Sequence, residues 1–509
     1  MASNRTERSA VSLRSAAVSG ALWSGLQMVV NKASALVGTL VSMYLLNPEA
    51  FGVAAVAASI LAYVTLLPAI TLSDVLLARP ETIASRLAPA TRLCVVTTAL
   101  SVVSLLAVGF WWAERFSDQG IWHACLCLSV RPVGELLLLG PQTLLRARLD
   151  FKRLSQIDAI AQVASTAATV VMAAAGLGFF SLVIPPGLAV FVRALMYARV
   201  AGANILQIGR RDLAPHSTRE LLRDYGLSGL GQYVHGGLIM SPPLILGAYY
   251  STDVVGCFST AFALSASFNV VVAVGLGLVL QPVFARMGND RSRQQIAFVR
   301  TCAVIAAVSM PVCVCQSLCV APVFRLIMPP SWSSAIIFAQ LLSLGQSMYF
   351  IVNPAMGLLK AQGRFMAFFI WQAVQLAVVS CLMVVCGNVL SDDGVGVVAI
   401  FSFYHIVFSP IGLALCIPIG DGFVSAIRQV VLGPLAATAL ALTPVALAAT
   451  ILEVSGWRDL ALVIAACGSI LLLYPKSLRI CAPEVYCEVK DVVFSLLRRK
   501  SSNAPQQAS

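Results

Sequence analysis

The sequence predicts an all-α membrane protein with about 14 transmembrane helices. Fourteen mostly apolar stretches lie between Ala17 and Tyr474, and each is long enough to cross the ~30 Å hydrocarbon core of a bilayer as a helix. Hydrophobic residues make up 59% of the chain and charged residues only 11%, whereas soluble domains contain ~25% charged residues. A soluble core of this length could not bury so much apolar surface, so much of it is expected to face lipid.

The predicted spans follow one another with short connections. They cover residues 17–45, 51–73, 88–112, 121–141, 156–177, 182–201, 226–250, 254–282, 297–324, 333–359, 365–388, 394–419, 430–452 and 459–475. This order divides the chain into an N-terminal tail, a six-helix lobe, a linker, a second six-helix lobe, a helix pair and a C-terminal tail. These parts cover residues 1–16, 17–201, 202–225, 226–419, 430–475 and 476–509.

Positive charge is distributed unequally between the two sides of the predicted membrane. Of the 34 Lys and Arg residues, all but six fall in the tails and in alternate connections. The intervening connections contain only Arg115, Arg325 and Arg458. Cytoplasmic loops carry an excess of Lys and Arg, so both termini are expected in the cytoplasm. This topology and anionic lipid headgroups account for the net charge of +12, and no nucleic-acid partner is expected.

A weak internal repeat relates the two predicted lobes at an offset of 204 residues. Leu45–Gly52 aligns with Tyr249–Gly256, and both are short acidic outer turns that end in Gly and join the first two spans of a six-span block. Because six is an even number, the two blocks share one orientation and form a parallel repeat. A transport pathway is expected at the interface of such repeats.

Several classes of function are disfavoured by what the connections lack. The outer loops are short, so they leave no room for an outer catalytic domain, and no enzyme activity is expected. The sequence contains no Gly-rich loop ending in Gly-Lys-Ser/Thr, which an ATP-driven pump would need to hold phosphates. Four His residues without a His and carboxylate cluster disfavour a metal site, and no cofactor is expected.

Three cations lie inside predicted spans: Lys32 in the first, Arg131 in the fourth and Arg193 in the sixth. A charge at the bilayer centre costs ~2.5–3.5 kcal/mol on insertion scales and usually faces a cavity or a partner. Glu135 follows Arg131 at i+4, within pairing distance on one helix face. Asp158 lies at the inner end of its span and is not counted among the deep charges. The three cations and Glu135 then carry a net charge of two positive charges. Such a cavity suits a diphosphate, to which Arg offers paired donors and Lys a point charge.

Simpler interpretations of these cations remain open. Arg131 and Glu135 are equally well explained as a structural pair that neutralises itself. Arg193 has the alternative of extending toward the inner interface, where Arg199 already lies. Lys32 is too deep in its span for that, and a water-filled cavity explains it better.

Uncharged polar residues line the rest of the expected pathway. Gln27 and Asn31 lie on the first span, and His235 lies opposite Asn31 in the repeat alignment, either on the pathway or in a hydrogen bond between helices. The second lobe has no Lys or Arg inside its spans, and its polar residues there are mainly amides and hydroxyls. A pathway with one cationic and one hydrogen-bonding wall suits a phosphate-bearing sugar chain better than a drug cation.

Three segments resemble Wzx-type polysaccharide flippases of the multidrug/oligosaccharidyl-lipid/polysaccharide (MOP) superfamily. Trp23–Gln27 and Leu45–Gly52 are similar to the opening of these transporters, and Leu144–Lys152 to their inner loop between spans 4 and 5. The similarity covers roughly residues 17–420 in organisation. It implies two six-helix lobes around a central cavity in the bacterial inner membrane.

The resemblance also implies a function. Such proteins move undecaprenyl-diphosphate-linked oligosaccharide repeat units from the cytoplasmic to the periplasmic leaflet by alternating access, for exopolysaccharide, capsule or lipopolysaccharide synthesis. In them, cavity cations hold the diphosphate, a role that Lys32, Arg131 and Arg193 fit by type and depth. The last two spans would border a groove for the polyprenyl tail. Lipid-linked oligosaccharide, membrane lipids and other polysaccharide assembly proteins are the partners expected.

Two other functions compete with this one. A multidrug cation antiporter of the same superfamily needs membrane carboxylates, whereas the first span carries Lys32 and Glu135 has a cation beside it. A membrane polymerase or ligase acting on the same sugars would need a large outer loop with catalytic residues, and the sequence has none.

Overall fold

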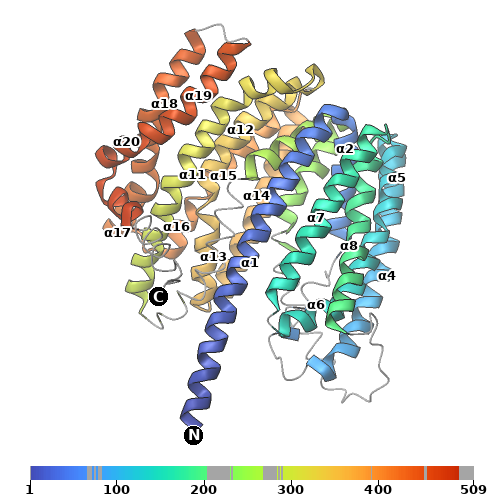
Figure 1. Ribbon diagram of the computed structural model, residues 1–509. Helices are drawn as coiled ribbons and strands as arrows, with labels where there is room; N and C mark the ends of the chain where they lie inside the picture. Colours follow the sequence, from blue (N-terminus) through green and yellow to red (C-terminus); the bar gives the residue numbers. More distant parts are fainter. Residues whose placement is uncertain are drawn as a thin grey trace, which may run out of the picture. The chain divides into compact units, whose positions relative to one another are not determined.

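The computed structural model describes residues 2–65, 72–73, 76–77, 83–148, 150–202, 230, 233–234, 236–267, 284, 287, 290–390, 393–451 and 456–491. Helices and turns account for nearly all of these residues, and no strand occurs among them (Figure 1). The main helices are α1 (Ala2–Leu45), α2 (Pro48–Val64), α4 (Ile83–Phe116), α5 (Gln119–Leu128), α6 (Val130–Ala147), α7 (Phe151–Ala174), α8 (Phe180–Ala201), α11 (Arg291–Ile327), α12 (Ser333–Tyr349), α13 (Val352–Ala361), α14 (Phe365–Val389), α15 (Val395–Phe408), α16 (Ile411–Cys416), α17 (Asp421–Ile427), α18 (Gly433–Ile451), α19 (Trp457–Leu472) and α20 (Tyr474–Cys481).

Ten helical segments in the described part of the chain are long and apolar enough to cross a membrane. The pair α19 and α20, bent by 45°, makes an eleventh if it is one span. The second, seventh and eighth predicted spans coincide with shorter described helices at Pro48–Val64, Gly236–Tyr249 and 252–267. The prediction of an all-helical, multi-pass membrane protein is confirmed, whereas the number fourteen is not.

The chain forms two compact units, and each is described here by itself. Unit 1 contains Met1–Thr260 and Gln372–Asn388, and unit 2 contains Ala261–Trp371 and Val389–Ser509. The division differs from the lobe boundary predicted at 202–225, because helix 236–249 and most of α14 pack with the first unit. The extents of the two lobes therefore stay a prediction.

Unit 1 is held together by close helix crossings at small residues. α1 runs along α7, with the methyl group of Thr166 against Gly38, and α8 packs on α6 with Val190 against Gly134. Small residues allow backbones to approach, which is how helices associate in lipid where the hydrophobic effect gives little between them. Apolar side chains such as Val37 on α1 stay exposed, as expected for a surface that faces acyl chains.

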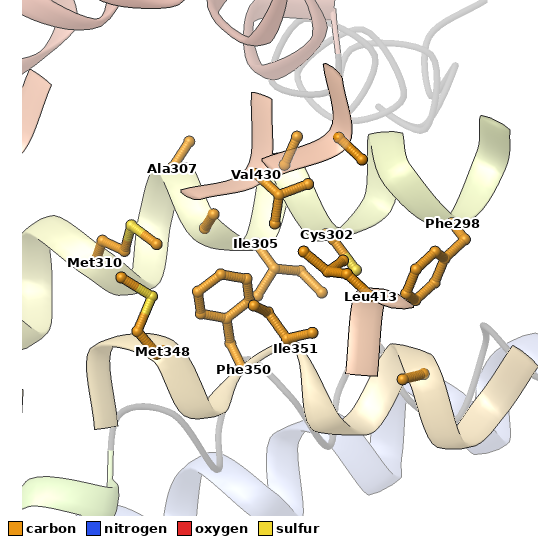
Figure 2. Close-up of a cluster of buried hydrophobic side chains, with 14 of the residues drawn as sticks. Phe298, Cys302, Ile305, Ala307, Met310, Met348, Phe350, Ile351, Leu413 and Val430 are labelled. Carbon is orange, nitrogen blue, oxygen red and sulfur yellow. The ribbon is translucent and has the colours of Figure 1, made fainter. Parts of the chain in front are cut away.

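Unit 2 is organised around α11, a helix of 37 residues that packs on α12, α18 and α19. Its largest cluster of buried apolar side chains joins α11 to the α12–α13 junction and to α16, with Phe350 and Ile351 facing Ile305 and Cys302 (Figure 2). Such dense packing supplies dispersion contacts that lipid-exposed positions lack.

An ion pair connects the last turn of α11 to the first turn of α19. Arg325 donates from Nε and Nη2 to Asp459 Oδ1 at 3.1 and 2.6 Å. Asp459 is 1% exposed, although it belongs to the first turn of α19. A carboxylate buried this deeply needs a charged partner, so the contact holds the C-terminal helix pair against the rest of unit 2.

We expect Arg325→Ala to lower the stability of the protein in detergent, because Asp459 would then be buried without its donor. A lost partner of this kind costs about 1–3 kcal/mol. Thermal unfolding followed by loss of monodisperse protein measures the effect, and Arg291→Ala at an exposed position of the same helix is the matched control. In a double-mutant cycle with Asp459→Ala, additive losses would show that the pair does not act as one unit.

Candidate functional site

A cavity of about 310 Å³ lies within unit 1 and contains one of the predicted cations. α2, α6 and the start of helix 236–249 enclose it. Its lining consists of Ala58, Leu61, Ala62, Tyr63, Thr65, Arg131, Pro132, Glu135, Tyr233, Gly236, Gly237 and Met240. The volume is at the lower end of the range typical of small-molecule sites.

Arg131 and Glu135 form the ion pair that their i, i+4 spacing on α6 predicts. Arg131 Nε donates to Glu135 Oε1 at 3.2 Å, and the two side chains are 41% and 28% exposed. In the described part of the chain, Nε is the only nitrogen of Arg131 with a hydrogen bond, so Nη1 and Nη2 are left available. The carboxylate therefore orients the guanidinium, and its two terminal groups can still bind a ligand.

Two tyrosines that the sequence did not single out line the same cavity. Tyr63 and Tyr233 meet edge to face, with ring centroids 6.0 Å apart. Tyr63 also donates its hydroxyl to the carbonyl of Gly237 at 3.1 Å, across the cavity from α2 to helix 236–249. In the sequence, the only indication that these tyrosines have a role is that each places a phenol inside an apolar span, where its hydroxyl needs a hydrogen-bond partner.

A second polar cluster joins α1, α7 and α8 around Asp158. Its carboxylate accepts from Gln27 Nε2 at 3.1 Å and from the Tyr197 hydroxyl at 2.5 Å, and Arg193 Nη1 lies 3.7 Å away. Tyr197 is fully buried, so the carboxylate links three helices inside unit 1. The sequence left Asp158 apart from the deep cations. That expectation was wrong, because two helices folded together bring residues 35 positions apart into contact.

Two further predicted residues of α1, Asn31 and Lys32, are not among the residues that line the cavity. Lys32 is half-buried on α1 and has no carboxylate partner among the described residues. The Oδ1 atom of Asn31 is buried without a hydrogen bond, one turn after Gln27. His235 lies outside the described residues. Since Asp158 offsets Arg193 and Glu135 offsets Arg131, the excess among these groups falls from the predicted two positive charges to one, on Lys32.

The fold is shared with solved transporters and flippases. "Lipid II flippase MurJ, inward closed conformation" is similar with a TM-score of 0.65 and 13% identity, over 91% of this chain and 98% of that one. "Inward-facing conformation of a multidrug resistance MATE family transporter of the MOP superfamily" gives a TM-score of 0.57 and 14% identity, over 79% and 95%. The class is therefore that of a MOP-like membrane transporter fold, as the sequence predicted.

A family model described as "Polysaccharide biosynthesis protein" matches residues 44–337, more than half of the chain. The chain belongs to this polysaccharide biosynthesis family. It is also 24% identical over 346 residues to the "Succinoglycan biosynthesis transport protein ExoT" of Rhizobium meliloti (strain 1021), over 65% of this chain and 66% of that protein. The match thus spans just under two thirds of the length of that relative. Family and fold confirm the prediction that the chain is not an enzyme.

We expect Asp158→Asn to destabilise unit 1, because the change removes the charge that Arg193 faces and weakens two hydrogen bonds. The expected loss is about 1–3 kcal/mol, the range for buried polar groups that lose their partners. Thermal unfolding in detergent measures it, with Glu114→Gln at an exposed position as control. If Asp158→Asn unfolds at the same temperature as the control, the cluster does not join the three helices.

Proposed function

We propose that this chain moves undecaprenyl-diphosphate-linked oligosaccharide repeat units from the cytoplasmic to the periplasmic leaflet of a bacterial inner membrane by alternating access. The observation that carries the proposal is the cavity of unit 1, where a guanidinium oriented by Glu135 lies beside two tyrosines. Membership of a polysaccharide biosynthesis family and similarity to a succinoglycan biosynthesis transport protein support a substrate of this class.

Arg131 is the group that we assign to the diphosphate. Its Nε is held by Glu135, so Nη1 and Nη2 can donate to two oxygens of one phosphate in the bidentate manner that guanidinium groups favour. Glu135 offsets the charge while the cavity is empty, which lowers the cost of keeping a cation at this depth. The diphosphate, with one negative charge on each phosphate, then adds a partner of greater total charge than the single carboxylate.

Tyr63 and Tyr233 suit the sugar that follows the diphosphate. An aromatic ring offers an apolar face to the C–H groups of a pyranose, while the phenol hydroxyl exchanges hydrogen bonds with sugar hydroxyls. Thr65 adds a hydroxyl at the same end of α2. The cavity has room for the diphosphate and the first sugar rather than a whole repeat unit, so the remainder would extend beyond it.

Lys32 and Arg193 have different parts in the proposal. Lys32 does not line the cavity in this structure, so it is proposed as a second cation from α1 for another state of the transport cycle. Arg193 faces Asp158 at 3.7 Å, so it supports the packing of α7 and α8 and contacts the diphosphate only if that pair opens.

The alternative is a multidrug cation antiporter, and the fold alone does not separate it from a flippase, since a MATE transporter is also similar. The cavity favours the flippase. A lipophilic cation needs an available carboxylate, whereas Glu135 already accepts from Arg131. Asp158 is likewise engaged, by Gln27, Tyr197 and Arg193.

We expect Arg131→Gln to reduce flipping of an undecaprenyl-diphosphate sugar in proteoliposomes by about 10–100-fold. This corresponds to the ~1.5–3 kcal/mol that a hydrogen bond to a charged group contributes. Arg131→Lys should retain part of the activity, because it keeps the charge but loses the fork. Arg291→Gln, on an exposed part of the chain, is the control. Full activity of a folded Arg131→Gln protein would contradict the assignment.

The same proteoliposomes distinguish the two functions. We expect the protein to flip the diphosphate-linked sugar and to leave a cationic dye where it was added. Uptake of the dye in exchange for Na⁺ or H⁺ and driven by the gradient of that ion, without sugar flipping, would establish the antiporter instead. The Arg131→Gln protein should show reduced sugar flipping and should likewise leave the dye where it was added.

A further inference from the structure

A second cavity, of about 500 Å³, lies within unit 2. Its walls come mainly from the first three turns of α11, from α17 and the turn that follows it, and from helix 483–491. Three ionisable side chains line it, those of Arg300, Glu484 and Glu488. A few convergent polar groups in a concave site are typical of a place where a ligand binds.

Helix length places this cavity at the level of the lipid headgroups. Arg300 lies 27 residues before Ile327, where α11 ends, and this separation corresponds to ~40 Å of helix. A bilayer with both headgroup regions is about 40–45 Å thick. The last turn of α11 carries Arg325, as suits one interface of the membrane, so Arg300 and the cavity are expected at the other.

The two carboxylates of the cavity lie one turn apart on helix 483–491 and have different partners. Arg300 Nε lies 3.1 Å from Glu488 Oε1 in an ion pair. Glu484 Oε2 accepts from Gln429 Nε2 at 2.7 Å, and Glu484 has no ion pair within the described part of the chain. The lining therefore carries two negative charges and one positive charge.

The shortage of positive charge affects the ionisation of Glu488. Burial raises the pKa of Glu488, and the guanidinium of Arg300 opposes this shift without cancelling it. Glu484 acts in the same direction as burial, because one negative charge disfavours ionisation of the next. A cationic ligand beside the two carboxylates would stabilise the ionised form of both.

The donors and acceptors suit an ammonium group better than a metal ion. Mg²⁺ and Ca²⁺ take six or more oxygen ligands, and no three His, Cys, Asp or Glu side chains of the described residues are grouped to hold a metal. A primary ammonium has three N–H donors. Gln429 uses Nε2 for the Ser425 hydroxyl and Glu484, which leaves its Oε1 as an acceptor beside the second oxygen of Glu484.

A smaller cavity of about 130 Å³ adds a cation on the other side of the Gln429–Glu484 hydrogen bond. It shares Ser425, Gln429 and Glu484 with the larger cavity, and Arg428 lines it. A guanidinium suits a phosphate. Ile296 in the lining of the larger cavity is 56% exposed and offers apolar surface to an acyl chain. An ammonium, a phosphate and an acyl chain in close succession are the chemistry of an ethanolamine phospholipid.

We propose that unit 2 binds the headgroup of an ethanolamine phospholipid, with the ammonium at Glu484 and the phosphate at Arg428. None of the residues that hold it lines the cavity of unit 1, so the lipid is a second ligand and not the transported substrate. A headgroup at this place contacts α11, α17 and helix 483–491 together. Its binding therefore stabilises the folded unit 2.

The test compares two lipids that differ only in the amine. The full-length protein is purified in detergent, and binding of dioleoyl phosphatidylethanolamine and dioleoyl phosphatidylcholine is measured by native mass spectrometry. The choline headgroup keeps the phosphate and the positive charge but has no N–H to donate. We expect the ethanolamine lipid to bind about tenfold more tightly, the effect of roughly one hydrogen bond to a charged group.

Three variants assign the two ends of the headgroup. Glu484→Gln should abolish the preference for the ethanolamine lipid, because it removes the charge that faces the ammonium. Arg428→Gln should weaken binding of both lipids equally, since both contain the phosphate. Glu114→Gln at an exposed position of unit 1 is the matched control and should bind both lipids as the unchanged protein does. Thermal unfolding without added lipid verifies that each variant is folded.

Equal binding of the two lipids by the unchanged protein would overturn the proposal, and so would an unaltered preference in a folded Glu484→Gln protein. Titration with spermidine and with Mg²⁺ tests soluble cations at the same carboxylates. Stabilisation by either cation that is lost in Glu484→Gln, without a preference for the ethanolamine lipid, would assign the site to that cation and reject the lipid.

Discussion

A buried ionised side chain is costly without a partner, and three ion pairs among the described residues meet this constraint. Arg131 has Glu135, Arg193 has Asp158, and Arg325 has the nearly inaccessible Asp459. The three pairs differ in what they join. The first lies within one helix and orients a guanidinium in a cavity, whereas the second connects the consecutive helices α7 and α8 and the third connects α11 to the distant α19. Charge is therefore used both to hold helices together and to prepare a binding group.

The difference between local and distant pairs explains what could be predicted from the sequence. The Arg131–Glu135 pair follows from spacing on one helix, and it was predicted correctly. The Asp158 cluster depends on how α1, α7 and α8 pack, which hydropathy does not encode, so Asp158 was left out of the charge balance. Tyr63 and Tyr233 were missed for the same reason, since their importance comes from facing one cavity. The membrane class followed from apolar length alone, while the exact number of spans depends on helices such as α2 that are shorter than the apolar stretch suggested.

The repeat is a case in which a weak sequence signal acquires a physical meaning. Eight aligned residues around each acidic turn were little more than a pattern until the structure placed their glycines against each other. A small residue at a helix crossing is common in membrane proteins. Gly52 and Gly256 occupy equivalent positions of the predicted repeat, and at each the backbone of the facing helix leaves no room for a Cβ, so the repeat corresponds to a specific contact.

The ion pair between α11 and α19 also constrains how the protein is assembled in the membrane. Asp459 is synthesised 134 residues after Arg325, and its carboxylate is almost completely enclosed once the two helices meet. The start of α19 is therefore fixed by a guanidinium that belongs to a much earlier part of the chain. A change at Arg325 is accordingly expected to reach the C-terminal helix pair, although the two lie far apart in the sequence.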